Sequence, residues 1–369
     1  MTRTYFRRPP RTAALLLLFF YLAVSVFTVE ATRFRAEKEH AGLMRAAAEK
    51  TEACFAVLRD ARVAAGYPID PLADPNSTGM IGMEFTGITT SLGNLESKRS
   101  TANPNCAAMI TDFLVQCGVG AGDTVCLNLS GSFPSLNVAA LCALDTLDAR
   151  GIVINSIGAS SYGANLPEFA YPDMEHVLLE HGLIANHTRW CSLGGSRDAG
   201  IDMLEPELAR AAAERAAANG VELISAENAE ESLLIREELY TRESGGLENV
   251  RCFINIGGNV FAFAGGDSLI DAPNGVIRAP FRNMEHRGLI PWFLDRGIPV
   301  IHLLEMRSLL TAAGLPFDPV PMPKAGEGDV YYELRFRAPI VIGAFLGFLL
   351  LIGLLAVRSA GQESSLRDQ

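Results

Sequence analysis

The chain has 369 residues, of which 49% are hydrophobic, and a formal net charge of −11 at pH 7. This length allows one large domain or two modest ones, together with membrane anchors. The acidic balance argues against nucleic acid as a partner, because the phosphate backbone would be repelled.

Two uncharged apolar segments lie near the ends of the chain, at residues 13–29 and 338–357, the second being apolar throughout from residue 340. Each is near the lower end of the roughly 17–25 residues that a membrane-spanning helix needs. Each is also apolar on every face, which a helix buried in a soluble core rarely is. The sequence therefore predicts two transmembrane helices, with a cleaved signal peptide as the alternative for the first.

The placement of positive charge predicts the orientation of these helices. Residues 1–12 carry four arginines and no acidic residue, which favours a cytoplasmic N-terminal tail. Two spans return the tail at 358–369 to the same side, although Arg335 and Arg337 before the second span argue the other way. We expect a protein of the cytoplasmic (inner) membrane with both tails in the cytoplasm and the main domain outside it.

The region between the spans begins with a polar helical pattern. Residues 30–66 are rich in Ala, Glu, Arg and Lys, and they predict a helical stalk. Residues 67–79 contain three prolines and several turn residues, which are typical of a surface loop. We assign residues 67–337 to an extracytoplasmic domain.

Strand-like and helix-like runs then alternate. Strands are expected at 80–90, 124–129, 151–157, 221–225, 250–256 and 298–303, and helices at 104–117, 135–149, 173–181, 205–219, 227–243, 288–296 and 305–313. This alternation predicts an α/β fold with a mostly parallel sheet and helices on both faces. Because ligands bind at the carboxyl ends of such strands, residues 130–132, 157–161 and 257–259 are expected to share one rim.

The most informative stretch is 89–137, in which two small-polar loops lead into predicted helices. Lys98 and Arg99 are expected in a loop before a helix that has Asn103 as its N-cap and Pro104 in its first turn. Free N–H groups at helix starts attract anions, although an exposed charged loop is the alternative for the basic pair. The predicted ligand-binding residues are Lys98, Arg99, Ser100, Thr101, Asn103, Asn105, Ser130, Gly131, Ser132, Gly257, Gly258 and Asn259.

Ser130 and Ser132 lie between a strand and a helix, where a nucleophilic serine would lie in a hydrolase. The glycines of that motif are absent, because Asn128 and Pro134 occupy their positions. Helix capping is the alternative role. A serine nucleophile needs a base and a carboxylate, and the catalytic candidates are Ser130, Ser132, Asp267 and His286, with His302 as another histidine.

Other motifs are weaker. Gly118, Gly120 and Gly122 precede a strand rather than follow one, which indicates a turn and not a dinucleotide site. No metal-binding pattern is present in the sequence, and no metal or cofactor is predicted. The seven cysteines include no CxxC pair, so buried thiols are expected, with extracytoplasmic disulfides left open.

Three runs together resemble one protein family. They are GMEFTGITTSLGNLESKRSTANPNCAA at 82–108, GDTVCLNLSGSFPSLN at 122–137 and FINIGGN at 253–259. Between its two apolar segments the chain resembles the poly-γ-glutamate system proteins, bacterial membrane proteins encoded beside the synthesis and export components of that polymer. The distinctive loops of the family fall here on Ser100, Thr101, Asn103, Asn105, Ser130, Ser132, Asn255 and Asn259.

The resemblance implies a role in making, exporting or processing poly-γ-glutamate. Its implied partners are the membrane subunits of the synthase or exporter, with the polymer itself as a candidate ligand. The family brings no agreed catalytic mechanism, so whether the protein is an enzyme stays open. We expect an accessory component with an anion-binding domain. The alternatives are a hydrolase or transferase of γ-glutamyl amide bonds with a serine nucleophile and, more weakly, a sensor of small anions.

Overall fold

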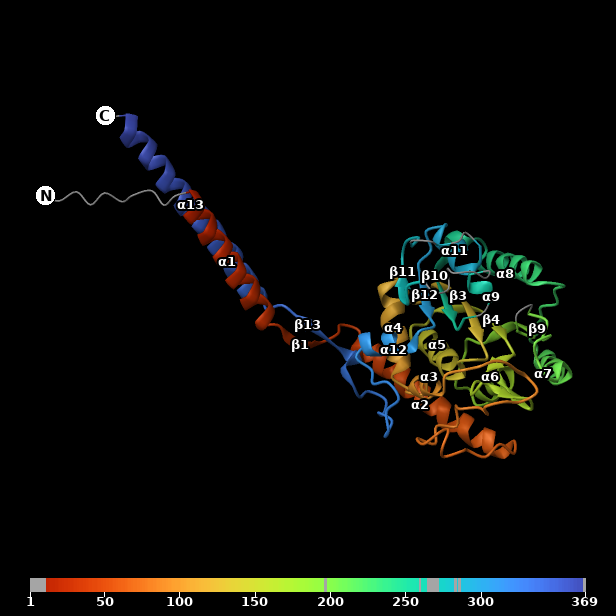
Figure 1. The fold of residues 1–369 in the computed structure, drawn as a ribbon. Coiled ribbons are helices and arrows are strands. Elements are labelled where there is room, and N and C mark those ends of the chain that lie inside the picture. Colours follow the sequence, from red (N-terminus) through yellow and green to blue (C-terminus); the bar gives the residue numbers. More distant parts are fainter. Residues whose placement is uncertain are drawn as a thin grey trace. The chain divides into compact units, whose positions relative to one another are not determined.

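The computed structural model describes residues 11–195, 198–258, 260–263, 272–281, 284 and 287–367. The chain divides into two compact units, one formed by residues 1–38 and 332–369 and the other by residues 39–331 (Figure 1).

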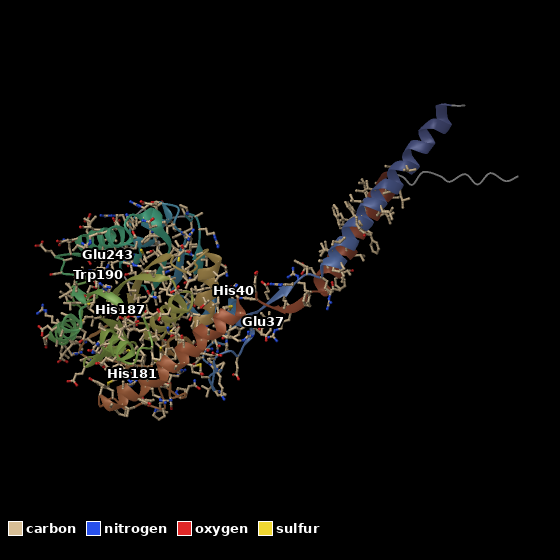
Figure 2. All side chains as sticks on the ribbon, turned by 180° about the vertical axis from the view of Figure 1, so that it is seen from behind. Glu37, His40, His181, His187, Trp190 and Glu243 are labelled. Carbon is tan, nitrogen blue, oxygen red and sulfur yellow. The ribbon has the colours of Figure 1, made fainter. Side chains whose placement is uncertain are left out.

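The first unit consists of two long helices and a short ladder. Helices α1 (Arg11–Ala31) and α13 (Ala338–Arg367) pair with each other, and strands β1 (Phe34–Glu37) and β13 (Tyr332–Arg335) pair antiparallel. The hydroxyl of Tyr21 donates to the carbonyl oxygen of Ala344 at 2.9 Å, and its ring stacks on Phe348. No residue in the apolar stretches of the two helices is buried, and both stretches are long enough to cross a membrane, which supports the two predicted spans (Figure 2).

The predicted stalk at residues 30–66 is not one helix. It is interrupted by β1, and its larger part is α2 (Ala41–Ala64), which belongs to the second unit. Helix α2 buries a row of apolar side chains that includes Met44 and Leu58, and it packs against helices α4 (Cys106–Gln116) and α5 (Pro134–Thr146). The polar composition of this segment concealed that apolar stripe.

The second unit is built on a seven-strand sheet, in the described part of the chain, with the order β11-β12-β10-β3-β4-β8-β9. Every neighbouring pair is parallel except β11 and β12, so the predicted fold class is confirmed. The strands are β3 (Thr124–Ser130), β4 (Arg150–Ser156), β8 (Thr188–Ser192), β9 (Glu222–Leu223), β10 (Val250–Ile256), β11 (Gly275–Ile277) and β12 (Val300–Leu303). Strands β8 and β11 were not expected from the sequence.

Helices cover both faces of this sheet. Helices α4 and α5 lie on one face with α2 packed over them, and α6 (Tyr171–Glu180) packs against α2 and against α7 (Pro206–Ala218). The other face is covered by α8 (Ala229–Ser244), α9 (Val260–Phe263) and α11 (Leu289–Leu294). The last helix of the unit is α12 (Met306–Ala312). Because helices cover both faces of the sheet, the ends of its strands remain accessible to loops and ligands.

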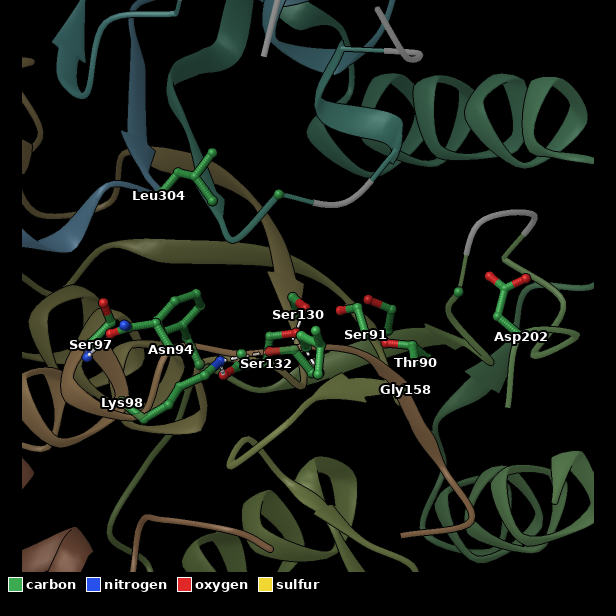
Figure 3. A pocket seen from close by; sticks show the side chains of 17 residues that line it. Thr90, Ser91, Asn94, Ser97, Lys98, Ser130, Ser132, Gly158, Asp202 and Leu304 are labelled. Carbon is green, nitrogen blue, oxygen red and sulfur yellow. Dashed lines mark hydrogen bonds between the residues drawn. The ribbon is translucent and has the colours of Figure 1, made fainter. Parts of the chain in front are cut away.

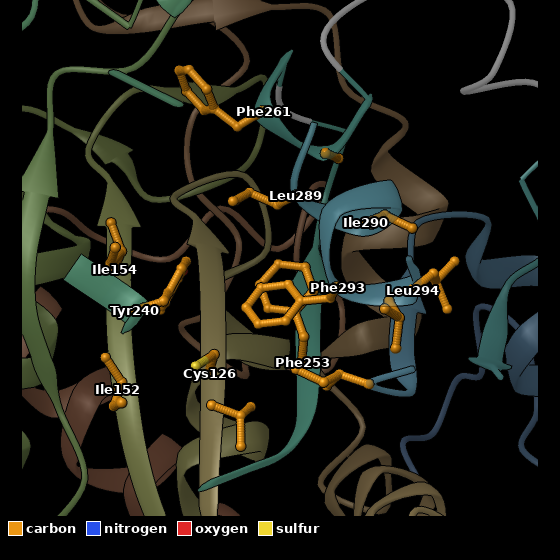
Figure 4. Packing of buried hydrophobic residues seen from close by; sticks show 14 of the residues in the cluster. Cys126, Ile152, Ile154, Tyr240, Phe253, Phe261, Leu289, Ile290, Phe293 and Leu294 are labelled. Atoms are coloured by element: carbon orange, nitrogen blue, oxygen red, sulfur yellow. The ribbon is translucent and has the colours of Figure 1, made fainter. Parts of the chain in front are cut away.

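The apolar centre of this second face is aromatic (Figure 4). The rings of Phe253 on β10 and Phe293 on α11 stack with centroids 4.3 Å apart, and Tyr240 of α8 meets both rings edge-on. The buried Tyr240 hydroxyl donates to the carbonyl oxygen of Leu127 at 2.8 Å. Stacked and edge-on pairs add to the free energy gained by burying apolar area.

The seven cysteines are all free. Six are buried, as expected, and Cys117 is half-buried. The sulfur atoms of Cys54 in α2 and Cys142 in α5 lie 3.6 Å apart inside the domain.

The predicted strand at 80–90 shortens to β2 (Thr89–Ser91), which pairs in parallel with β5 (Ala159–Ser160) outside the main sheet. The backbone at Gly82 packs against the loop after β5 instead, where its N–H donates to the carbonyl oxygen of Tyr162 at 3.0 Å. The preceding backbone is instead held by Arg62, which donates to the carbonyl oxygens of Gly79 and Ile81. The small sheet joins the loop before residue 98 to the loop after β4.

Candidate functional site

The carboxyl ends of the parallel strands form a polar rim. Ser130 at the end of β3 is in register with Ser156 at the end of β4, and Gly257 follows β10 next to the Ser130 side chain. The expectation that residues 130–132, 157–161 and 257–258 share one rim is therefore confirmed; Asn259 lies outside the described residues.

A cavity of about 540 Å³ opens at this rim (Figure 3). Its walls come from the loop after β2, from helix α3 (Leu95–Thr101), and from the loops that follow β3, β4, β8, β10 and β12. The lining residues are Thr90, Ser91, Leu92, Gly93, Asn94, Ser97, Lys98, Ser130, Ser132, Phe133, Ser156, Gly158, Ser160, Gly195, Asp202, Gly258 and Leu304.

Lys98 is the principal cation of this cavity. The sequence predicted a loop at Lys98, but the residue lies in helix α3. The N-cap of this helix, Asn94, accepts from the N–H of Ser97 at 2.7 Å. Its side chain is only 3% exposed. The Nζ atom donates to the carbonyl oxygen of Ser132 and to Oγ of Ser160, the latter at 2.8 Å.

Burial disfavours the charged form of Lys98 and lowers its pKa to about 7. The face of the Phe133 ring, whose centre lies 3.8 Å from Nζ, acts in the opposite direction, because it attracts the ammonium form. A lysine ordinarily titrates near pH 10.4. The amine is therefore able to exchange a proton near neutral pH, which an exposed lysine does not do.

Arg99 points away from the cavity. It forms a two-bond ion pair with Asp318, in which Nε lies 2.6 Å from Oδ1, and this hydrogen bonding raises the pKa of Arg99. Adjacent helical positions face about 100° apart, so two neighbouring basic residues take different environments. The pair is neither a shared anion site nor an exposed charged loop.

Hydroxyl groups of the loops after β3 and β4 make hydrogen bonds beside Lys98. Oγ of Ser132 accepts from the backbone N–H of Ser160 at 3.0 Å, and Oγ of Ser130 accepts from the N–H of Ser132 at 3.2 Å. Gly131 allows the loops to approach closely, since a Cβ atom there would lie 2.6 Å from the carbonyl oxygen of Ile157. The Asn137 amide donates to the carbonyl oxygen of Ser130 at 2.9 Å and fixes the end of β3. These loops form a rigid hydroxyl-lined wall.

Four predicted ligand-binding residues serve the fold in this structure: Ser100, Thr101, Asn103 and Asn105. All are fully buried, and none lines the cavity described above. Asn105 bonds to the carbonyl oxygen of Lys324, the N–H of Gly326 and the hydroxyl of Tyr331. Helix α4 also begins later than predicted, at Cys106, and its start is covered by these contacts.

Of the expected histidine and carboxylate partners of the serines, only His302 lies among the described residues. Asp267 and His286 lie outside the described residues. His302 is fully buried on β12, where its Nδ1 lies 3.1 Å from the Asn255 amide nitrogen, and burial lowers its pKa to about 4. It does not line the cavity. Across the described residues, no three His, Cys, Asp or Glu side chains are grouped as metal ligands.

The lining residues that the sequence did not predict include Ser156, Phe133 and Asp202. Ser160 lies within the predicted rim, but nothing in the sequence pairs it with Lys98, which lies 62 positions earlier. Among the described residues, the cavity thus offers one buried amine, several hydroxyl groups and one carboxylate. Such a set can bind a carboxylate, or it can exchange a proton between the amine and a hydroxyl group.

Comparison of the chain with protein-family models, curated proteins and solved structures found no match.

Proposed function

We propose that this chain is a membrane-anchored accessory component of a poly-γ-glutamate synthesis or export system, and that its α/β domain binds carboxylate groups of the polymer outside the cytoplasm. The observation that carries the binding part is Lys98, whose amine reaches the polar cavity at the carboxyl rim of the sheet. The pathway rests on the resemblance of the loop sequences. The two exposed apolar helices support the membrane anchor.

The chemistry of the cavity suits a small acidic group. A carboxylate beside Lys98 would favour the charged amine, because an opposite charge within about 4–6 Å raises a lysine pKa. Hydroxyl groups of Ser130, Ser132 and Ser160 could donate further hydrogen bonds. The cost of placing a charge in this buried site would be offset by the pair itself.

The net charge limits what can bind. At −11 the chain as a whole repels a long polyanion. A cavity of about 540 Å³ accommodates a short end of the polymer rather than a length of it. We therefore propose that an end of the polymer, and not its middle, binds at Lys98.

Binding of short γ-linked glutamate oligomers to the detergent-solubilised full chain tests this proposal. Wild type should bind at pH 6, where Lys98 is charged, and lose affinity by pH 8.5. Lys98→Met should abolish binding, whereas Lys324→Met, which removes an exposed lysine outside this cavity, should not. Equal binding by both variants would reject Lys98 as the anion site.

The accessory role has its own test. Affinity purification of the tagged chain from its native membrane should recover the polymer synthase or export subunits. Repeated recovery of the chain without either, under conditions that preserve other membrane complexes, would reject this part of the proposal.

A further inference from the structure

A serine hydroxyl lies in direct contact with the buried amine of Lys98. Oγ of Ser160 is 2.8 Å from Nζ, and both residues line the cavity. A neutral amine at this distance can accept the hydroxyl proton, and a lysine performs this role in some serine hydrolases in place of histidine. Neither Ser130 nor Ser132 has a comparable contact between its Oγ and a basic group in the described structure.

We infer that Ser160 is a nucleophile activated by Lys98, and that the cavity cleaves or transfers acyl groups from amides that carry a nearby carboxylate. The choice of a γ-glutamyl amide as substrate rests on the proposed function. The assignment of nucleophile and base does not, because it follows from the contact between the two side chains.

The reaction balances with these two groups and water. Oγ of Ser160 attacks the amide carbonyl carbon while its proton moves to Nζ of Lys98. The C–N bond breaks as Lys98 returns that proton to the leaving nitrogen, which leaves an ester on Ser160. Water, or the amine of a second chain, then attacks the ester with Lys98 again taking the proton. Lys98 finally returns it to Oγ as the acyl group departs.

Ser132 positions both groups. Its carbonyl oxygen accepts from Nζ of Lys98, and its Oγ accepts from the backbone N–H of Ser160. Ser132 therefore holds the amine and the hydroxyl in one geometry without being the nucleophile. Rigid positioning of this kind lowers the barrier by reducing the entropy lost at the transition state.

The backbone around Ser160 also departs from ordinary conformations. Tyr162, two residues later, has φ of 64°, in the left-handed region that non-glycine residues rarely adopt. Its N–H donates to the carbonyl oxygen of Met83 at 2.8 Å, which holds that conformation. Such conformations concentrate at functional sites. On the other side, Gly93 leaves room near the nucleophile, because a Cβ atom there would lie 3.0 Å from Oγ of Ser160.

The charged groups around Lys98 allow its neutral form. On α3, Glu96 pairs with Arg307, and Arg99 pairs with Asp318. Among the described residues, the loop after β2, strand β5 and the start of α5 bring only uncharged side chains to the cavity, and Asp202 is the other charged residue of the lining. Burial lowers the pKa of Lys98 to about 7. Nucleophilic reactivity should therefore rise with pH through about 7, opposite to anion binding.

A fluorophosphonate probe, followed by peptide mass spectrometry, tests the assignment in the detergent-solubilised full chain. Ser160 should be labelled, with its Oγ displacing fluoride, and the rate should increase from pH 6 to pH 8.5. Ser160→Ala should abolish labelling. Lys98→Met should slow it by roughly 10²–10⁴-fold, the range expected for loss of a general base.

The matched control is Ser161→Ala, which removes the neighbouring buried hydroxyl outside the cavity lining. It should label at the wild-type rate. Ser132→Ala should keep the pH profile but label more slowly, which separates positioning from nucleophilic attack. Labelling of Ser130 or Ser132 in place of Ser160, or no labelling in a folded wild-type chain, would overturn the inference.

A chromogenic γ-glutamyl anilide separates this inference from the proposed function. Release of the aniline that depends on Ser160 supports both. Labelling of Ser160 without any binding of γ-glutamyl compounds retains the nucleophile and rejects the ligand. Binding of oligomers at Lys98 without labelling of Ser160 retains the accessory function and rejects the enzyme.

Discussion

The middle of the parallel strands and their carboxyl ends differ sharply, although both are buried. In mid-strand, Cys126 and Phe253 enter a cluster of buried apolar and aromatic side chains. At the ends of the same strands, Ser130 and Gly257 adjoin a cavity that contains the buried amine of Lys98. Burial in this sheet therefore forms an apolar core in mid-strand and encloses a polar cavity at the strand ends.

The energetic consequences of the two regions are opposite. Removing apolar area from water in mid-strand stabilises the fold by about 25 cal/mol per Å². Burying an amine at the rim costs free energy unless the amine is paired or loses its proton. The buried amine at the rim thus lowers the stability of the fold, whereas the aromatic cluster raises it. Residues that lower stability are common at functional sites.

The largest expected effect concerns Lys98 and pH. Its pKa is about 7 when folded and 10.5 when unperturbed. The unfolded chain binds the proton more tightly between these values, so the free energy of unfolding rises with pH from 7 to 10.5. Lys98→Met should remove this slope and stabilise the protein at pH 7 by up to about 5 kcal/mol. Urea unfolding of both proteins at pH 7 and pH 10 measures the free energy of unfolding at each pH. An equal change with pH in the two proteins would contradict the prediction.

The aromatic cluster should respond in the opposite direction. Phe253→Ala removes one of the two rings that stack 4.3 Å apart, and it should lower the free energy of unfolding by about 3–5 kcal/mol. Circular dichroism during thermal unfolding measures the loss. Labelling of Ser160 below the unfolding temperature should be nearly unchanged. If labelling were lost while the fold persisted, the two regions would not be separate.

His302 tests whether a buried polar group between the two regions behaves like Lys98. Its pKa is about 4 when folded and 6.5 when unperturbed. The unfolded chain again binds the proton more tightly, so stability should fall as the pH drops from 6.5 to 4, by about 3 kcal/mol. His302→Gln, which keeps a polar partner for Asn255, should reduce that fall. An unchanged acid profile would assign it to other groups.

The smallest effect is expected at Arg99, next to Lys98 in the chain. Its pair with Asp318 is partly exposed, and exposed pairs contribute only about 0.2–1 kcal/mol. Arg99→Gln should therefore lower stability by less than about 1 kcal/mol and leave oligomer binding intact. Isothermal titration with γ-linked glutamate oligomers compares it with Lys98→Met. Equal loss of binding in both variants would show that the basic pair acts together.

The sequence predicted the fold better than the site. Apolar runs such as 124–129 and 250–256 identified parallel strands, and the rule that ligands bind at their carboxyl ends identified the rim correctly. Local patterns did not reveal that Lys98 lies in a short helix. They also did not reveal that β2 pairs with β5 and thereby brings Ser160 to the amine. Those contacts depend on which loops pack together, and that depends on the whole fold.

The same limit explains the polar residues that were misplaced. Asn103 and Asn105 resemble ligand-binding residues in sequence, because an amide that holds a loop and an amide that holds a ligand are chemically identical. For Asn105, contacts with Lys324 and Tyr331 decide between these roles, and they come from a segment more than 200 positions away.

The pairing of α1 with α13 has a consequence for experiments on topology. Arg337, just before α13, donates to the carbonyl oxygen of Thr32, just after α1, and Tyr21 contacts Ala344. The two helices therefore run in opposite directions. The start of α1 and the end of α13 therefore emerge in the same compartment, whichever way the pair of helices is inserted. Enzymatic reporters fused to the two termini must agree with each other, and a single active fusion is enough to place both.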